Sequence, residues 1–262
     1  MRAVAAIVGR EFRRLLRQRG RLLSSLARPL LWLFIIGSGF SGLVALHSGL
    51  SYRDFLLPGV VAMVLLFSSM LAALSTVYDR ELGMMRMMLI APISRLGLVV
   101  AKVMSSAAVG AVQGIALLLL VPAFGLEPGA GGLALTLAGV LLTSLTLAAI
   151  GMLLASRIGS IENFAVVMNF VLFPMFFLSG GLYPVAQLPS LLRAVALANP
   201  LTYGIDVMKH GLFGAGAGAF GGELPLGLDL GALAVAGAAA TLLAVRAFSR
   251  EERLAAMAVR PS

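Results

Sequence analysis

The sequence predicts an all-α integral membrane protein with six transmembrane helices. Of its 262 residues, 60% are hydrophobic and only 12% are charged, whereas about 25% of the residues of a soluble domain carry a charge. Mean hydropathy is +1.01, and the few charges are clustered, with long uncharged stretches between them. A spanning helix needs about 20 such residues, because a charge at the bilayer centre costs roughly 2.5–3.5 kcal/mol.

The uncharged stretches place the six spans along the chain. Five of them are longer than the roughly 20 residues that a span needs. The sixth, residues 230–245, is shorter and is lengthened by the apolar residues that precede Asp229. The predicted spans are residues 29–48, 55–78, 103–124, 133–156, 163–183 and 226–246, within one transmembrane domain of residues 22–248.

The distribution of positive charge predicts the orientation. Three of the 20 Lys and Arg residues, Arg53, Arg193 and Lys209, lie in connections on one side, and all others lie on the opposite side. Because positive loops stay inside, both termini are expected in the cytoplasm, including a tail of residues 249–262, in a multi-pass protein of the inner membrane. The net charge of +9 is therefore interpreted as a topology signal, and no nucleic-acid partner is expected.

Residues 1–21 form a basic arm ahead of the first span. On a helix, Val4, Val8 and Phe12 share one face, and most of the arginines occupy the opposite face. This segregation predicts an amphipathic helix lying at the cytoplasmic interface, with arginines toward lipid phosphates. A plain basic flank, or a signal peptide, explains the charge without the segregation. The arginines assigned to the interface are Arg10, Arg13, Arg14 and Arg17.

The residue inventory argues against catalysis. There are no cysteines and two histidines, both in predicted outer connections. The two lysines precede Val103 and His210, so neither belongs to a phosphate-binding G-x-x-x-x-G-K-[ST] loop. We therefore expect no enzyme activity, no catalytic or metal-binding residues and no cofactor in this chain. A membrane enzyme using outer-loop acids such as Asp206 and Glu223 is a remaining alternative.

Two connections contain more information than the spans. The cytoplasmic loop 79–100 has a charged start, a Met-rich turn and a proline stop, which suits either docking to another protein or an extension of the flanking spans. Between the fifth and sixth spans, glycines and prolines divide residues 184–213 into short helical pieces. These pieces predict a re-entrant outer segment over the end of a pathway, or a surface hairpin without special role. The Gly110–Gly114 spacing is attributed to chance among 30 glycines.

The motifs in these connections resemble those of one transporter family. The first is Arg80-Glu81-x-Gly83, followed by Ala91-Pro92-Ile93-Ser94-Arg95 and Lys102. The second runs from Leu178-Ser179-Gly180-Gly181-Leu182-Tyr183-Pro184 through Leu188-Pro189 to Asn199-Pro200-Leu201-Thr202-Tyr203 and Asp206. Both resemble the permease subunits of ABC type-2 exporters, which include nodulation-factor, drug-resistance and polysaccharide export permeases. Ala91 and Ala101 depart mildly from the usual Ser and Gly.

The resemblance implies a function. The chain would form the translocation pathway for an amphipathic, lipid-linked or drug-like substrate, as a homodimer or with a closely related second permease. Two copies of a separate ATP-binding-cassette ATPase would hold ATP and magnesium. A non-transporting membrane scaffold or assembly factor is the alternative.

It also implies site residues. Coupling to the ATPase is assigned to Asp79, Arg80, Glu81, Gly83, Arg86, Pro92, Ser94 and Arg95. The outer gate is assigned to Ser179, Gly180, Gly181, Pro184, Pro189, Asn199, Pro200, Tyr203 and Asp206.

Overall fold

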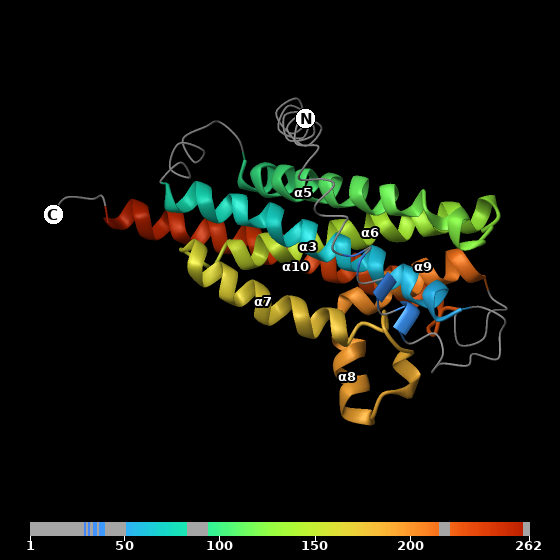
Figure 1. Cartoon of the computed structure of the whole chain (residues 1–262). Helices are drawn as coiled ribbons and strands as arrows, with labels where there is room; N and C mark the ends of the chain where they lie inside the picture. Colours follow the sequence, from blue (N-terminus) through green and yellow to red (C-terminus); the bar gives the residue numbers. More distant parts are fainter. Residues whose placement is uncertain are drawn as a thin grey trace.

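The computed structural model describes residues 51–82, 94–214 and 221–258, together with residues 29, 31, 34, 35 and 37–39. Within these parts every regular element is helical, as predicted. Figure 1 shows long helices lying side by side, with the short α8 projecting from the bundle. The elements are α3 (Tyr52–Glu81), α5 (Arg95–Leu118), the 3-10 turn η1 (Val121–Phe124), α6 (Ala130–Ala155), α7 (Ile161–Phe177), the turn η2 (Val185–Gln187), α8 (Ser190–Ala198), α9 (Pro200–Phe213) and α10 (Leu226–Ala258).

Four of the described helices are long and apolar enough to cross a membrane. They are α3, α5, α6 and the Leu226–Ser249 part of α10. The 17-residue α7 is a shorter apolar helix at the position of the predicted fifth span. The chain is thus a multi-pass membrane protein. The arm 1–21 and most of the predicted span 29–48 lie outside the described residues, so the count of six remains a prediction.

The loop between α3 and α5 is shorter than the predicted loop 79–100. Helix α3 continues to Glu81, and α5 begins at Arg95, where the Ser94 hydroxyl caps it by accepting a hydrogen bond from Gly97 N (3.1 Å). Lys102, which marked the edge of a predicted span, lies inside α5. Its ammonium forms an ion pair with Asp79 (2.5 Å), and this pairing allows the helix to carry the charge.

Small residues bring α5 and α6 close together. A Cβ at Gly110 would lie 2.7 Å from Ser144 Oγ, and one at Gly114 would lie 3.0 Å from a Val140 methyl group. The Ser144 hydroxyl donates to the Ala107 carbonyl of α5 (2.6 Å). Because small residues let helix backbones approach in a membrane, the Gly110–Gly114 spacing marks a packed helix contact, and attributing it to chance was wrong.

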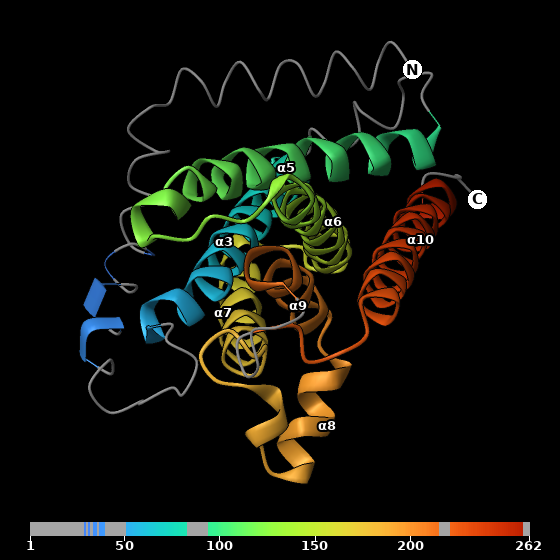
Figure 2. The same ribbon diagram turned by 90° about the vertical axis from the view of Figure 1, so that its right-hand side faces the viewer.

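Helix α9 occupies the centre of the bundle, although the predicted outer segment contained it. Figure 2 shows α9 between α3, α6, α7 and α10, and its most extensive packing is against α6. A Cβ at Gly211 would lie 2.6 Å from the Gly132 carbonyl oxygen of α6, and one at Gly204 would lie 2.2 Å from Thr143 Oγ1. The two helices therefore pack along a seam of small residues, which holds the polar side chains of α9 in place.

Candidate functional site

The described members of the predicted coupling set lie at the end of the bundle where α3 and α6 finish and α5 and α7 begin; they are Asp79, Arg80, Glu81, Ser94 and Arg95. We call this end of the bundle the Arg80 end. The Arg80 guanidinium donates to three carbonyl oxygens at the end of α6, those of Ala155 (3.1 Å), Ser156 (2.9 Å) and Ile158 (3.0 Å). It also lies 5.6 Å from the centre of the Phe248 ring on α10. Arg80 thus caps one helix and contacts another.

The residues on either side of Arg80 connect α3 to two more helices. Asp79 accepts a hydrogen bond from the Lys102 ammonium of α5, which also donates to Thr76 Oγ1 (3.2 Å). A Glu81 carboxylate oxygen accepts a hydrogen bond from the backbone N–H of Ile161, the first residue of α7 (3.3 Å). Three consecutive residues of α3 therefore contact α5, α6 and α7 in turn.

Only some of the remaining predicted coupling residues belong to the part of the chain that the structure describes. Ser94 caps α5 and Arg95 begins it, whereas Gly83, Arg86 and Pro92 lie outside the described residues, as do the arginines of the arm. The structure therefore brings Asp79, Arg80 and Glu81 together as contacts within this chain, at the edge of the loop that would dock a partner.

The predicted outer-gate residues gather around the chain that leaves α7. Gly180 has φ +76°, a left-handed conformation that glycine adopts at little cost. Gly181 packs against Gly59 of α3, where an added Cβ would lie 2.9 Å from Gly59 Cα. The Ser179 hydroxyl donates to the Phe176 carbonyl (2.6 Å). This turn ends α7 six residues before the predicted limit of that span.

Asn199 connects the end of α7 to the start of α9. Its amide donates to the Met175 carbonyl (2.6 Å), and its side-chain oxygen accepts from Leu201 N (3.0 Å) as the cap of α9. The Tyr203 hydroxyl donates to the Leu197 carbonyl of α8 (2.5 Å). The three predicted prolines each mark a helix start: Pro184 and Pro189 immediately precede η2 and α8, and Pro200 is the first residue of α9.

Two tyrosines of this region have perturbed acidities. Burial raises the pKa of Tyr183 above its ordinary value. Burial also raises the pKa of Tyr203, and the negative charge of Asp229 adds to this effect. Both phenols act as hydrogen-bond donors, Tyr183 to the Phe177 carbonyl and Tyr203 to the Leu197 carbonyl.

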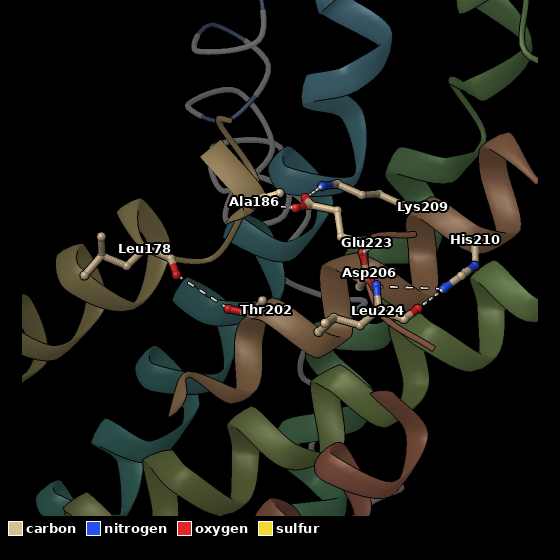
Figure 3. Close-up of polar contacts among 8 residues, drawn as sticks. All are labelled: Leu178, Ala186, Thr202, Asp206, Lys209, His210, Glu223 and Leu224. Carbon is tan, nitrogen blue, oxygen red and sulfur yellow. Dashed lines mark hydrogen bonds and ion pairs between the residues drawn. The ribbon is translucent and has the colours of Figure 1, made fainter. Parts of the chain in front are cut away.

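Asp206 organises a network of charged groups that we call the Asp206 end (Figure 3). Its two carboxylate oxygens accept hydrogen bonds from the backbone N–H groups of Glu223 and Leu224, both at 2.8 Å. The Lys209 ammonium forms an ion pair with Glu223 (2.9 Å), although the Lys209 side chain is only 1% exposed. Glu223 also accepts from Ala186 N (2.9 Å). The linker into α10 is thereby fastened to α9 and to η2.

His210 lies one helical turn after Asp206 and faces two carboxylates. Its Nε2 lies 3.9 Å from Asp206 Oδ2 and 3.7 Å from Asp229 Oδ2, and it donates to the Leu224 carbonyl oxygen (2.8 Å). Asp229, in the first turn of α10, is fully buried. Potential metal-ligand atoms of Asp206, His210 and Asp229 all lie within 4.8 Å of one another.

A small cavity of about 30 Å³ adjoins this network, between α8, α9 and the linker. Asp206, Lys209 and Glu223 line it together with Ser179 and Arg193. Its volume is enough for one or two water molecules. The cavity is therefore far too small for a transported solute.

The sequence assigned Asp206 to the predicted outer gate and named Asp206 and Glu223 as outer acids, but did not group Lys209, His210 and Asp229 with them. The i, i+4 spacing of Asp206 and His210 was a usable signal, because such residues share a helix face. Nothing in the spacing of Asp229, on a different helix, could reveal that it contacts the same cluster.

Comparisons with known proteins agree with the motifs and the helical fold. The profile described as ABC-2 type transporter matches residues 2–213. The chain is 31% identical over 196 residues to Nodulation protein J of Rhizobium leguminosarum bv. trifolii, covering 74% of each chain. It is 29% identical over 209 residues to the putative transport permease ycf38 of Cyanophora paradoxa, covering 78% of this chain and 71% of the relative.

A second Nodulation protein J, from Rhizobium meliloti (strain 1021), is 28% identical over 214 residues and covers 81% of this chain and 79% of the relative. The family profile extends over both connections that carry the motifs, and the four membrane-length helices agree with it. The chain therefore belongs to the ABC-2 type transporter family.

Proposed function

We propose that this chain is the membrane-spanning permease of an ATP-driven exporter in the inner membrane. It would act as a homodimer with two copies of a separate ATP-binding-cassette ATPase. The observation that carries the proposal is the family match over residues 2–213. The names of its relatives, which include a putative transport permease, support transport rather than a scaffold role.

The contacts at the Arg80 end support a coupling role for the loop 82–94. The loop joins α3 to α5, and Arg80 and Glu81 connect the same place to α6 and α7. A force that an ATPase applies to this loop would therefore reach four helices through short polar contacts. Methionines and arginines within the loop, such as Met85 and Arg86, would provide the docking surface.

The region from Ser179 to Asp206 is proposed to close the outer end of the pathway. Its turn packs on α3 through Gly181, and its helix α9 packs on α6 through Gly204. Movement of α3 against α6 would thus be transmitted to the segment that covers the outlet. The cargo is proposed to be amphipathic, lipid-linked or drug-like, because apolar helices would let it enter sideways from the bilayer.

Copurification tests the assignment of a partner. The full chain is expressed with an ATP-binding-cassette ATPase encoded beside its gene, and a complex of two permeases with two ATPases is expected on a sizing column. Reconstituted in vesicles, the complex should hydrolyse ATP and move a fluorescent lipid. Failure to recover any ATPase complex would reject the proposal.

The double variant Glu81→Ala/Arg86→Ala tests coupling, with the exposed Arg157→Ala as its matched control at the same end. The double variant should lose transport or complex formation, and the control should keep both. If assembly and ATP-stimulated transport survive in the double variant, the coupling assignment is wrong.

A further inference from the structure

We propose that Asp206, His210 and Asp229 form a binding site for one Zn²⁺ ion at the junction of α9, the linker and α10. The Leu224 carbonyl oxygen would be the fourth ligand. The site is separate from the transport function proposed above, and its role would be to fasten the last described helix to the helix at the centre of the bundle.

The distances suit a metal site. Nε2 of His210 lies 3.7 Å and 3.9 Å from the two carboxylates and 2.8 Å from the Leu224 carbonyl oxygen. Zinc binds nitrogen and oxygen at about 2.0–2.2 Å with tetrahedral geometry, so two ligand atoms of one ion lie roughly 3.3–3.6 Å apart. The two carboxylates lie a few tenths of an ångström beyond this spacing and the Leu224 carbonyl oxygen lies inside it. Metal binding would therefore draw the carboxylates, now within 4.8 Å of the imidazole and of each other, inward and turn the imidazole away from the carbonyl.

Asp229 provides independent support. Its side chain is 0% exposed, and no N–H group of the part of the chain that the structure describes donates a hydrogen bond to either of its carboxylate oxygens. Its neighbour on α9 is the carboxylate of Asp206, with which it can hydrogen-bond only when one of the two is protonated. A buried carboxylate without a donor is costly unless it is neutralised or bound to a cation. Asp229 Oδ2 also faces His210 at 3.7 Å. The carboxylate that lacks a hydrogen-bond donor therefore lies at the proposed metal site.

The surrounding charges also favour a cation. Asp206, Glu223 and Asp229 contribute three carboxylates, and Lys209 is the buried cation that pairs with one of them. Carboxylates exceed cations even if the exposed Arg193 on α8, which lines the adjacent cavity, is counted.

The mixed ligands favour zinc. An imidazole nitrogen beside carboxylate and carbonyl oxygens suits Zn²⁺ better than Ca²⁺ or Mg²⁺, which prefer oxygen alone. The His210 side chain is 21% exposed, which gives an ion access from solvent. On binding, Nε2 would lose its proton, which passes to solvent from an imidazolium or is replaced by a proton on Nδ1 in the neutral ring, and the Leu224 carbonyl would turn from hydrogen-bond acceptor to ligand.

Zinc titration of the purified full-length protein in detergent, stripped of metal beforehand, tests the site. Calorimetry should show one Zn²⁺ per chain. At a free concentration about 100 times Kd the melting temperature should rise by roughly 5 °C. The variants His210→Ala and Asp229→Asn should each weaken zinc binding by more than about tenfold, because even the loss of a residue that only hydrogen-bonds to a ligand typically costs about 10–100-fold.

Two matched variants serve as controls. His47→Ala removes the other histidine, and Glu127→Gln removes a carboxylate elsewhere in the chain; both should bind zinc as the wild type does. Because Asp229→Asn keeps the side-chain shape, it is expected to fold. Its melting temperature without zinc, compared with that of the wild type, separates lost binding from lost folding.

The proposal is overturned if the wild type shows neither heat of binding nor a zinc-dependent melting shift. It is also overturned if His210→Ala responds to zinc as the wild type does. A wild type that gains stability on acidification and ignores zinc would indicate a proton shared by the two carboxylates instead. None of these readouts uses transport, so they leave the proposed exporter function untouched.

Discussion

The two ends of the bundle place charged side chains in different surroundings. At the Arg80 end, a cation meets the carbonyls that finish α6, and the carboxylate of Glu81 meets the N–H that starts α7. At the Asp206 end, a buried carboxylate of α10 faces another carboxylate and a histidine and accepts no hydrogen bond from an N–H group of the described residues.

The difference indicates that the charges at the Arg80 end stabilise the bundle, whereas those at the Asp206 end are able to bind a ligand. The carboxyl end of a helix carries partial negative charge and its amino end partial positive charge, so the contacts at the Arg80 end match the helix dipoles. They need no further ligand. At the Asp206 end, the Asp229 carboxylate accepts no hydrogen bond from an N–H group of the described residues. A buried carboxylate of this kind is suited to bind a cation.

Replacing Lys209 with methionine should have the largest effect on stability. The buried ammonium pairs with Glu223 and lies 4.7 Å from the centre of the Phe55 ring. Its loss leaves Glu223 among other carboxylates, and breaking a buried pair costs about 3–5 kcal/mol. Thermal unfolding in detergent measures the loss.

Arg193→Met is the control, because it removes an exposed cation at the same end of the bundle. This variant should unfold at nearly the wild-type melting temperature. Adding Glu223→Gln to Lys209→Met should restore part of the stability. Equal melting of Lys209→Met and the wild type would show that the pair contributes nothing.

Arg80→Ala should have the next largest effect, because it removes the donor to three carbonyl oxygens at the end of α6. Hydrogen bonds to a charged group contribute about 1.5–3 kcal/mol, and a loss of this order is expected together with loss of ATP-stimulated transport. Arg80→Lys should recover only part of the lost stability and transport, because an ammonium lacks the planar, forked donor geometry of a guanidinium. A fully active Arg80→Ala variant would contradict the structural role.

Gly211→Ala tests whether the position of α9 depends on close approach. The new methyl group would meet the Gly132 carbonyl oxygen at 2.6 Å and Thr136 N at 2.7 Å. Both are backbone atoms, so α9 must move, at a cost of about 1–3 kcal/mol. Gly231→Ala on α10, where the added carbon would meet nothing within 4 Å apart from the neighbouring backbone of its own helix, should be neutral or stabilising. Similar melting temperatures of the two variants would show that close approach of α9 and α6 at Gly211 does not contribute to stability.

Glu81→Gln should have the smallest effect on stability. The side chain is exposed, and its single 3.3 Å contact with the start of α7 is of a kind that contributes about 0.3–1 kcal/mol. A drop in melting temperature that shrinks as salt is added would confirm the electrostatic origin. A large, salt-independent drop would indicate that Glu81 has another partner.

The gross fold was predictable from hydropathy because the apolar helices are long. Helix α6 begins and ends within three residues of its predicted span, and α10 begins where expected. The start of α5 was missed by several residues, since Lys102 was assumed to lie outside the membrane helix. Its partner Asp79 lies on another helix, and one sequence does not reveal such pairing.

The candidate sites were predictable as segments and less so as contacts. Glycine and proline correctly marked the breaks around Gly180 and Pro200, because each imposes a local backbone conformation. The burial of Lys209 and Asp229 depends on where α9 and α10 pack. The placement of α9 follows from its seam of small residues with α6, which the sequence presents only as scattered glycines and threonines. Helix α10 packs in turn on both α6 and α9.

The contact between Arg80 and Phe248 has a consequence for the order of assembly. The guanidinium belongs to α3, its carbonyl partners to α6, and the aromatic ring to α10. During synthesis the arginine is made long before the ring that covers it. The cluster is therefore complete only after α10, the last described helix, has been inserted. A chain that ends before Phe248 would lack the ring that covers Arg80.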